Sequence, residues 1–276
     1  MEQYKANQAN CIRVEDMGGL ELFKAFYTTH AFSRHWHDGY GIGVIEAGCE
    51  VFDYRGDKHY ASPFNVILMN PGVIHTGQAA KQELGWNYRI MYPHPELIRK
   101  VVEQVREDQV ALPHFPNPVS ADQDSAGGLL RLFDVLAEST SVLERESVFL
   151  ITVAEIIRKH ATFIYPNPEW SANNIVAEHI REYIENYYFR NISLAELSMI
   201  SGKSQFHLLR IFQKRFGLPP HTYQTLIRIR RAKNLLLEGK PISEIALDMG
   251  FADQSHFTRL FKRVVGITPY HYCSNF

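Results

Sequence analysis

Hydrophobic residues in the first part of the chain come in short runs, which predict β structure. Residues 41–45, 51–54 and 65–69 are rich in β-branched and aromatic side chains, and glycine, aspartate and proline separate them. Such runs are typical of strands, and the residues between them are typical of turns. Because the turns recur about every 8–12 residues, the pattern predicts a small β-barrel or jelly roll.

From Pro95 onward the apolar residues recur at helical spacing instead. This period predicts helices over residues 95–108, 128–139 and 147–162, each with an apolar face that could pack on the barrel or on another subunit. Residues 165–171 hold two prolines among polar residues, a composition typical of a linker. We therefore expect an α+β chain, with a barrel and its following helices over residues 1–164 and an all-α domain over residues 172–276.

The second domain contains an internal repeat of a helix, a turn with glycine and a longer helix. The segment LSMISGKSQFHLLRIFQKRFG (197–217) is matched by IALDMGFADQSHFTRLFKRVVG (245–266). Ser204 and Asp253 precede the longer helices and are suited to cap them. The helical spacing of apolar residues predicts a long helix over residues 220–237, which would hold the two copies at a fixed distance. It also predicts a first helix of the domain over residues 175–188. The residues Gln205, His207, Arg210, Phe212 and Gly217 recur 49 positions later as Gln254, His256, Arg259, Phe261 and Gly266.

Each longer helix would bury one apolar stripe and leave the opposite stripe free. Arginine and glutamine on a free stripe can form paired hydrogen bonds with guanine or adenine in the major groove of DNA. The alternative is a plain helical bundle, in which Phe206 and Leu209 pack against a neighbour; arginine at matched positions of both copies favours DNA. The predicted buried positions include Leu208, Ile211, Phe212, Phe257 and Phe261. The candidate DNA-binding residues are Ser204, Gln205, Phe206, Leu209, Arg210, Gln213, Lys214, Gln254, Ser255, Thr258, Arg259 and Lys262.

Charge is distributed unevenly along the chain. Residues 171–276 carry 14 Lys and Arg against 8 Asp and Glu, a net +6, whereas residues 1–170 carry 15 against 22, a net −7. A basic segment on an acidic body indicates contact with a polyanion. The three cysteines form no CxxC pair, no apolar run approaches the ~20 residues of a membrane span, and the N-terminus has no signal pattern. We therefore expect a cytoplasmic protein with no membrane partner.

Residues 172–273 resemble the DNA-binding domain of the AraC/XylS family, above all in the stretch IALDMGFADQSHFTRLFKRVVGITPYHY (245–272). One departure is Ser198, where the family usually has alanine. The resemblance implies a transcription regulator that places two recognition helices in successive major grooves of double-stranded DNA. It also implies a homodimer that contacts RNA polymerase. Carried over by position, the base-facing candidates are Phe206, Leu209, Arg210, Gln254, Ser255 and Arg259.

Residues 34–37 (RHWH) and 70–75 (NPGVIH) resemble the cupin-like sensor domain of the same family. Related regulators bind a small effector inside this barrel and dimerise through the helices that follow it. Aromatic planes and a few polar groups suit a pocket for an organic effector; the alternative is that these side chains only fill the barrel. The candidate effector-binding residues are His35, His37, Tyr40, His75, Trp86, Tyr88 and Arg89.

The histidines also raise a metal hypothesis. His35 and His37 share a face of a predicted strand, and imidazoles from two strands can bind a divalent ion. Metal-binding cupins carry a glutamate shortly after the histidine pair, where this chain has Gly41 and Ile42. The missing carboxylate argues against a catalytic metal. We therefore expect no cofactor, with a divalent metal at His35, His37 and His75 as the alternative.

Two functions are consistent with these patterns. The first is a ligand-responsive transcription regulator with no catalytic activity. The second is a metal-dependent cupin enzyme fused to a DNA-binding domain. The chain has no glycine-rich nucleotide loop, no GxSxG and no HExxH motif, which favours the regulator.

Overall fold

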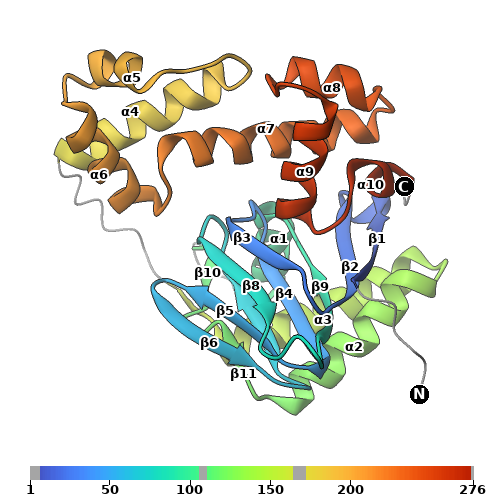
Figure 1. The fold of residues 1–276 in the computed structure, drawn as a ribbon. Coiled ribbons are helices and arrows are strands. Elements are labelled where there is room, and N and C mark those ends of the chain that lie inside the picture. Colours follow the sequence, from blue (N-terminus) through green and yellow to red (C-terminus); the bar gives the residue numbers. More distant parts are fainter. Residues whose placement is uncertain (1–6, 106–110, 164–171, 275–276) are drawn as a thin grey trace. The chain divides into compact units, whose positions relative to one another are not determined.

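The computed structural model describes residues 7–105, 111–163 and 172–274 (Figure 1). The chain divides between residues 166 and 167 into two compact units. The segment predicted as a linker, 165–171, lies outside the described residues, as do residues 106–108 of the first predicted helix. None of the described helices is both long enough and apolar enough to cross a membrane.

The N-terminal unit is built on two antiparallel sheets, drawn in blue to green in Figure 1. Two short strands, β10 (Pro113–His114) and β12 (Thr162–Phe163), form a separate antiparallel pair, and η1 (Glu15–Met17) is a single turn of 3₁₀-helix. The six-stranded sheet has the order β1 (Gln8–Val14), β2 (Leu20–Tyr27), β9 (Trp86–Met91), β4 (Gly41–Gly48), β7 (Val66–Met69) and β11 (Val119–Ser120). The four-stranded sheet has the order β3 (Ala31–His35), β8 (His75–Ala79), β5 (Glu50–Tyr54) and β6 (Asp57–Ala61).

Alternate residues of a strand point to opposite faces of the sheet, and the central strands of the six-stranded sheet are buried on both faces. On one face, Ile42, Val44 and Leu68 share a core with Leu129 and Phe149 of the helices that follow the sheets. Residues on the other face, such as Ile67 and Ile90, line a cavity that also takes residues from the four-stranded sheet. The sheet therefore separates a helix-packed core from the cavity.

Three helices complete this unit: α1 (Pro95–Val105), α2 (Gln123–Glu138) and α3 (Val142–His160). All three were predicted, but α2 and α3 begin about one turn or more before the predicted starts. The side chain of Asp122 accepts hydrogen bonds from the backbone N–H groups of Asp124 and Ser125, and Ser141 accepts one from Glu144. These N-caps satisfy otherwise unpaired N–H groups and fix the observed starts.

The C-terminal unit is entirely helical, drawn in yellow to red in Figure 1, which confirms the predicted fold class. The two copies of the repeat are α5 (Leu194–Ser201) with α6 (Gln205–Phe216) and α8 (Ile242–Asp248) with α9 (Gln254–Val265). Ser204 and Asp253 cap α6 and α9, as the sequence predicts. The other helices of the unit are α4 (Ala172–Tyr187), α7 (Pro220–Leu237) and α10 (Pro269–Ser274).

Candidate nucleic-acid interface and ligand cavity

Helix α6 presents an exposed face that carries the first set of candidate DNA contacts. Leu208, Ile211 and Phe212 are buried in the unit, as predicted. On the opposite side Phe206 is 71% exposed, and the guanidinium carbon of Arg210 lies 5.9 Å from the centre of its ring. An exposed aromatic ring beside an arginine suits contact with thymine methyl groups and base edges.

Helix α9 repeats this arrangement. Phe257 and Phe261 are fully buried. Asp253 accepts a hydrogen bond of 2.7 Å from the backbone N–H of His256 and fixes the first turn. The side chains on the opposite face form the second candidate set. Gln254, Ser255, Arg259 and Lys262 are exposed, and Thr258 is half-buried.

The cations of the two exposed faces are not neutralised by the unit itself. Among the residues the structure describes, Arg210, Lys214, Arg259 and Lys262 form no ion pair. Other arginines of the unit are paired: Arg181 and Arg215 with Glu178, and Arg190 with Glu196. The exposed faces of α6 and α9 therefore carry positive charge that no acidic residue in the described part of the unit compensates, and such charge attracts a polyanion.

The cavity of the N-terminal unit brings together four of the seven candidate effector residues. The volume of this cavity is about 30 Å³. His35, His37, His75 and Tyr88 line it, together with Phe32, Glu50, Ile67, Met69, Thr76, Ile90 and Tyr92. Residues of β3, β5 and β8 face residues of β7 and β9 across this space, so the cavity lies between the two sheets.

Three candidate residues do not line the cavity. Arg89 shares the face of β9 that carries Met91, and it forms ion pairs with Glu46 (2.7 Å) and with Asp134 of α2 (2.5 Å). Tyr40 is buried and donates a hydrogen bond of 2.8 Å to the carbonyl of Pro113. Trp86 packs parallel to Tyr88, with ring centres 6.1 Å apart. The placement of Arg89 in the pocket was wrong because strand alternation turns it towards the helices.

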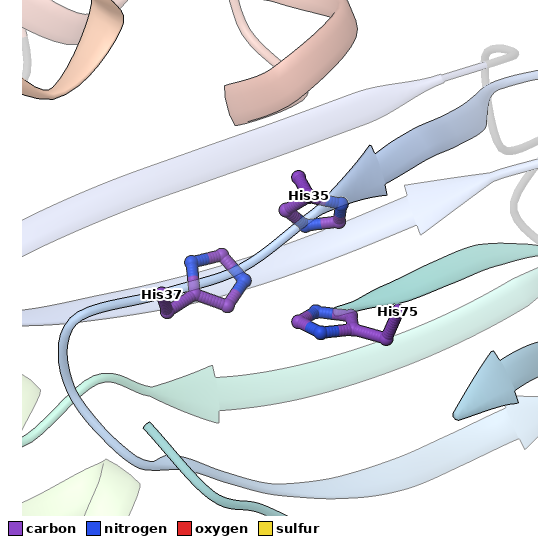
Figure 2. Close-up of side chains that lie close together, drawn as sticks. All are labelled: His35, His37 and His75. Atoms are coloured by element: carbon purple, nitrogen blue, oxygen red, sulfur yellow. The ribbon is translucent and has the colours of Figure 1, made fainter. Parts of the chain in front are cut away.

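The three histidine rings converge on one another (Figure 2). His35 lies directly opposite His75 in the pairing of β3 with β8, and their ring centres are 4.4 Å apart. The structure places His37 just beyond the end of β3, with its ring centre 4.9 Å from that of His35 and 5.1 Å from that of His75. Its backbone carbonyl accepts a hydrogen bond of 2.9 Å from Gly72, which ties it to the segment before His75.

Burial keeps two of these imidazoles neutral. Desolvation, with a smaller effect of neighbouring His75, lowers the pKa of His35 to about 3. Desolvation also lowers the pKa of His75 to about 4. Nδ1 of His35 lies 2.7 Å from the carbonyl of Ser33, and Nδ1 of His75 lies 2.9 Å from that of Val73. A neutral ring that donates from Nδ1 carries its lone pair on Nε2.

Glu50 is a cavity residue that the sequence analysis missed. It begins β5, is only 7% exposed and lines the cavity with the histidines. Burial raises the pKa of its carboxyl to about 8. A Cβ at Gly77 would lie 2.7 Å from its Oε1, so glycine leaves room for the carboxyl group. The one sequence signal is an acidic residue in front of the apolar run 51–52.

Known proteins with similar sequences show the family of this chain. A model described as the AraC-like ligand binding domain matches residues 18–150, and a helix-turn-helix domain matches residues 197–275. The HTH-type transcriptional regulator YbfI of Bacillus subtilis is 31% identical and the match covers 91% of this chain and 90% of that protein. The chain belongs to the AraC family of transcription regulators. The Arabinose operon regulatory protein of Salmonella typhimurium is 24% identical, with 84% and 82% covered.

Solved structures agree on the fold. ToxT from Vibrio cholerae matches with a TM-score of 0.58 and 14% identity, covering 99% of each chain. Another ToxT structure, with an unsaturated fatty acid bound, matches with a TM-score of 0.54 and 15% identity. The chain is thus a DNA-binding transcription regulator with a ligand-binding domain, as the sequence predicts.

Proposed function

We propose that α6 and α9 are the recognition helices and that each inserts its exposed face into a major groove of double-stranded DNA. The observation that carries this proposal is the matched pair of exposed faces, in which Arg210 and Arg259 occupy equivalent positions and have no acidic partner among the described residues. Arg210 and Arg259 contact base edges, since arginine binds guanine through two hydrogen bonds. Lys214 and Lys262 contact phosphates.

The test compares the full wild-type chain with a double variant, Arg210→Ala/Arg259→Ala, on a duplex selected by the wild type from random DNA. The double variant loses sequence preference while it keeps weak, salt-dependent binding. A control, Arg131→Ala on α2, removes one exposed charge outside the repeat and leaves specific binding unchanged. Retained sequence preference in the double variant contradicts the proposal.

The effector binds in the N-terminal unit and shifts the arrangement of the two DNA-binding units of a dimer. It can do so only if it binds one arrangement better than the other. The cavity between the sheets is the proposed site. Its small volume and its histidine and carboxyl groups suit a ligand smaller and more polar than the fatty acid found in ToxT. A thermal-shift screen of metabolites tests this, because a ligand of the folded state raises the melting temperature.

Two further partners belong to this proposal. Helix α3 exposes Val142, Leu143 and Ile151, with Leu143 74% exposed, which supports a homodimer that covers these side chains. A relative, RhaS of Enterobacter, is named as a transcriptional activator. By analogy we expect contact with RNA polymerase in the cytoplasm.

The rival hypothesis of a cupin enzyme fused to a DNA-binding domain requires turnover of a substrate at the histidines. The relatives named as regulators support binding without catalysis. We therefore propose that the N-terminal unit senses a ligand and does not transform it.

A further inference from the structure

We propose that His35, His37 and His75 bind a divalent transition metal ion in the cavity between the two sheets. Each histidine offers one nitrogen, and the three nitrogens lie within 4.8 Å of one another. A tetrahedral ion with bonds of about 2.1 Å holds its ligand nitrogens about 3.4 Å apart. The ligand nitrogens must therefore approach one another when an ion binds. Figure 2 shows the three rings turned towards a common space.

The surroundings orient two of the rings as a metal site requires. Metal-bound histidines usually donate their second ring N–H to a carbonyl or carboxylate, which fixes the tautomer and the direction of the ring. His35 and His75 both have this partner, in the carbonyls of Ser33 and Val73. Each carbonyl belongs to the residue two positions earlier in the chain, so the local backbone itself sets the ring. His35 and His75 then face each other across the β3–β8 ladder.

The cavity has room for an ion and a bound water. A volume of about 30 Å³ accommodates about two water molecules. An ion with three protein ligands keeps one position open for water or another donor. Imidazole ligands suit Zn²⁺, Cu²⁺, Ni²⁺ and Fe²⁺, whereas Mg²⁺ and Ca²⁺ prefer oxygen ligands.

Glu50 places a carboxyl group in the same cavity but outside the group of three converging nitrogens. It is therefore not one of the ligands that we propose, and it enters the cavity from β5, whereas the positions that follow the histidine pair are Gly41 and Ile42. The missing carboxylate at those positions argues against a catalytic metal, but the metal binding proposed here rests on the three histidines alone.

This inference concerns the cavity that we proposed for the effector, and its regulatory meaning rests on that proposal, but metal binding can be measured alone. Untagged full-length protein is stripped with a chelator and titrated with Co²⁺, whose visible absorption reports the coordination of nitrogen ligands, and Zn²⁺ is then added in competition. We expect one Co²⁺ per chain, displaced by one Zn²⁺. The variants His37→Ala and His75→Ala should weaken binding by at least about tenfold. The matched control is His94→Ala, because His94 is exposed and does not line the cavity.

Thermal unfolding provides a second measurement, because replacing the buried His75 also removes a core side chain. Saturating Zn²⁺ raises the melting temperature of the wild type and of His94→Ala, and not that of His37→Ala, in which only a half-buried ring is lost. Binding well below one ion per chain overturns the inference. Stoichiometric binding that survives the loss of both His37 and His75 also overturns it. DNA binding by the metal-free chain is measured in parallel, so failure of the metal site and failure of the proposed DNA contacts are distinguishable.

Discussion

Nη1 of Arg228 donates a hydrogen bond of 2.6 Å to the backbone carbonyl of Gly250. The same guanidinium donates through Nε to the carbonyl of Tyr188 (2.7 Å) and through Nη2 to that of Arg190 (3.0 Å). One buried side chain of α7 therefore joins the segment between α4 and α5 to the turn of the second helix-turn-helix unit. This contact ties the segment before α5 and the turn of the second unit to the long helix between the two copies.

We expect Arg228→Ala to destabilise the C-terminal unit by about 3 kcal/mol or more, since three carbonyl groups lose a charged donor. Chemical unfolding followed by circular dichroism measures the loss. Arg231→Ala is the matched control: Arg231 is exposed on the same helix and lies over the ring of Tyr188, so its removal should cost about 1 kcal/mol at most. Equal losses for the two variants would show that the three hydrogen bonds of Arg228 do not stabilise the unit.

Glu50 should make the N-terminal unit less stable as the pH rises. Its folded pKa of about 8 is above its ordinary value of 4.5, so between these values the folded state holds a proton that the unfolded state has lost. Stability therefore falls with rising pH in this window, by up to about 1.4 kcal/mol per pH unit. His35 and His75 have lowered pKa values and change stability in the opposite direction, but only below about pH 6.5.

The Glu50 contribution is isolated between pH 6.5 and 8, in the presence of a chelator. Glu50→Gln should remove the decline that the wild type shows there, with unfolding of the N-terminal unit followed at each pH. Glu46→Gln is the control for a change in charge, because Glu46 is only partly buried and is paired with Arg89. Parallel pH profiles for the wild type and Glu50→Gln would contradict the assignment.

The two helix-turn-helix units should bind half-elements about one turn of DNA apart. Helix α7 has 18 residues and is about 27 Å long, and major grooves on one face of the duplex recur about every 34 Å. Inserting five base pairs between the half-elements turns one of them to the far side and should abolish specific binding. The same insertion outside the site should have no effect. Unchanged affinity after the internal insertion, measured by fluorescence anisotropy, would mean that one unit alone contacts DNA.

Much of the C-terminal unit could be predicted because its signals are local. The helical period, the caps Ser204 and Asp253 and the repeated arginines all lie within short segments, and the structure confirms the helices and caps they predict. The role of Arg228 could not be found in this way, since its partners Tyr188 and Gly250 are 40 and 22 positions away.

The cavity was predicted less completely because it depends on the pairing of distant strands. His35, His37 and His75 were found together because their segments resemble a known domain. Glu50 reaches the cavity through the pairing of β5 with β8, which no local pattern specifies. Arg89 does not line the cavity for a different reason: the alternation of side chains along β9 puts it on the side of Asp134.

The central claim is that α9 contacts bases through Arg259 and phosphates through Lys262. Affinities of the wild type, Arg259→Ala and Lys262→Ala are measured for a selected site, for each of its single-base variants and at several salt concentrations. Our account predicts that Arg259→Ala costs about 1–3 kcal/mol on the selected site and removes the preference at one base pair, whereas Lys262→Ala weakens all sequences alike and lowers the salt slope by about 1. If Arg259→Ala weakens every sequence equally and leaves all base preferences intact, the account is contradicted.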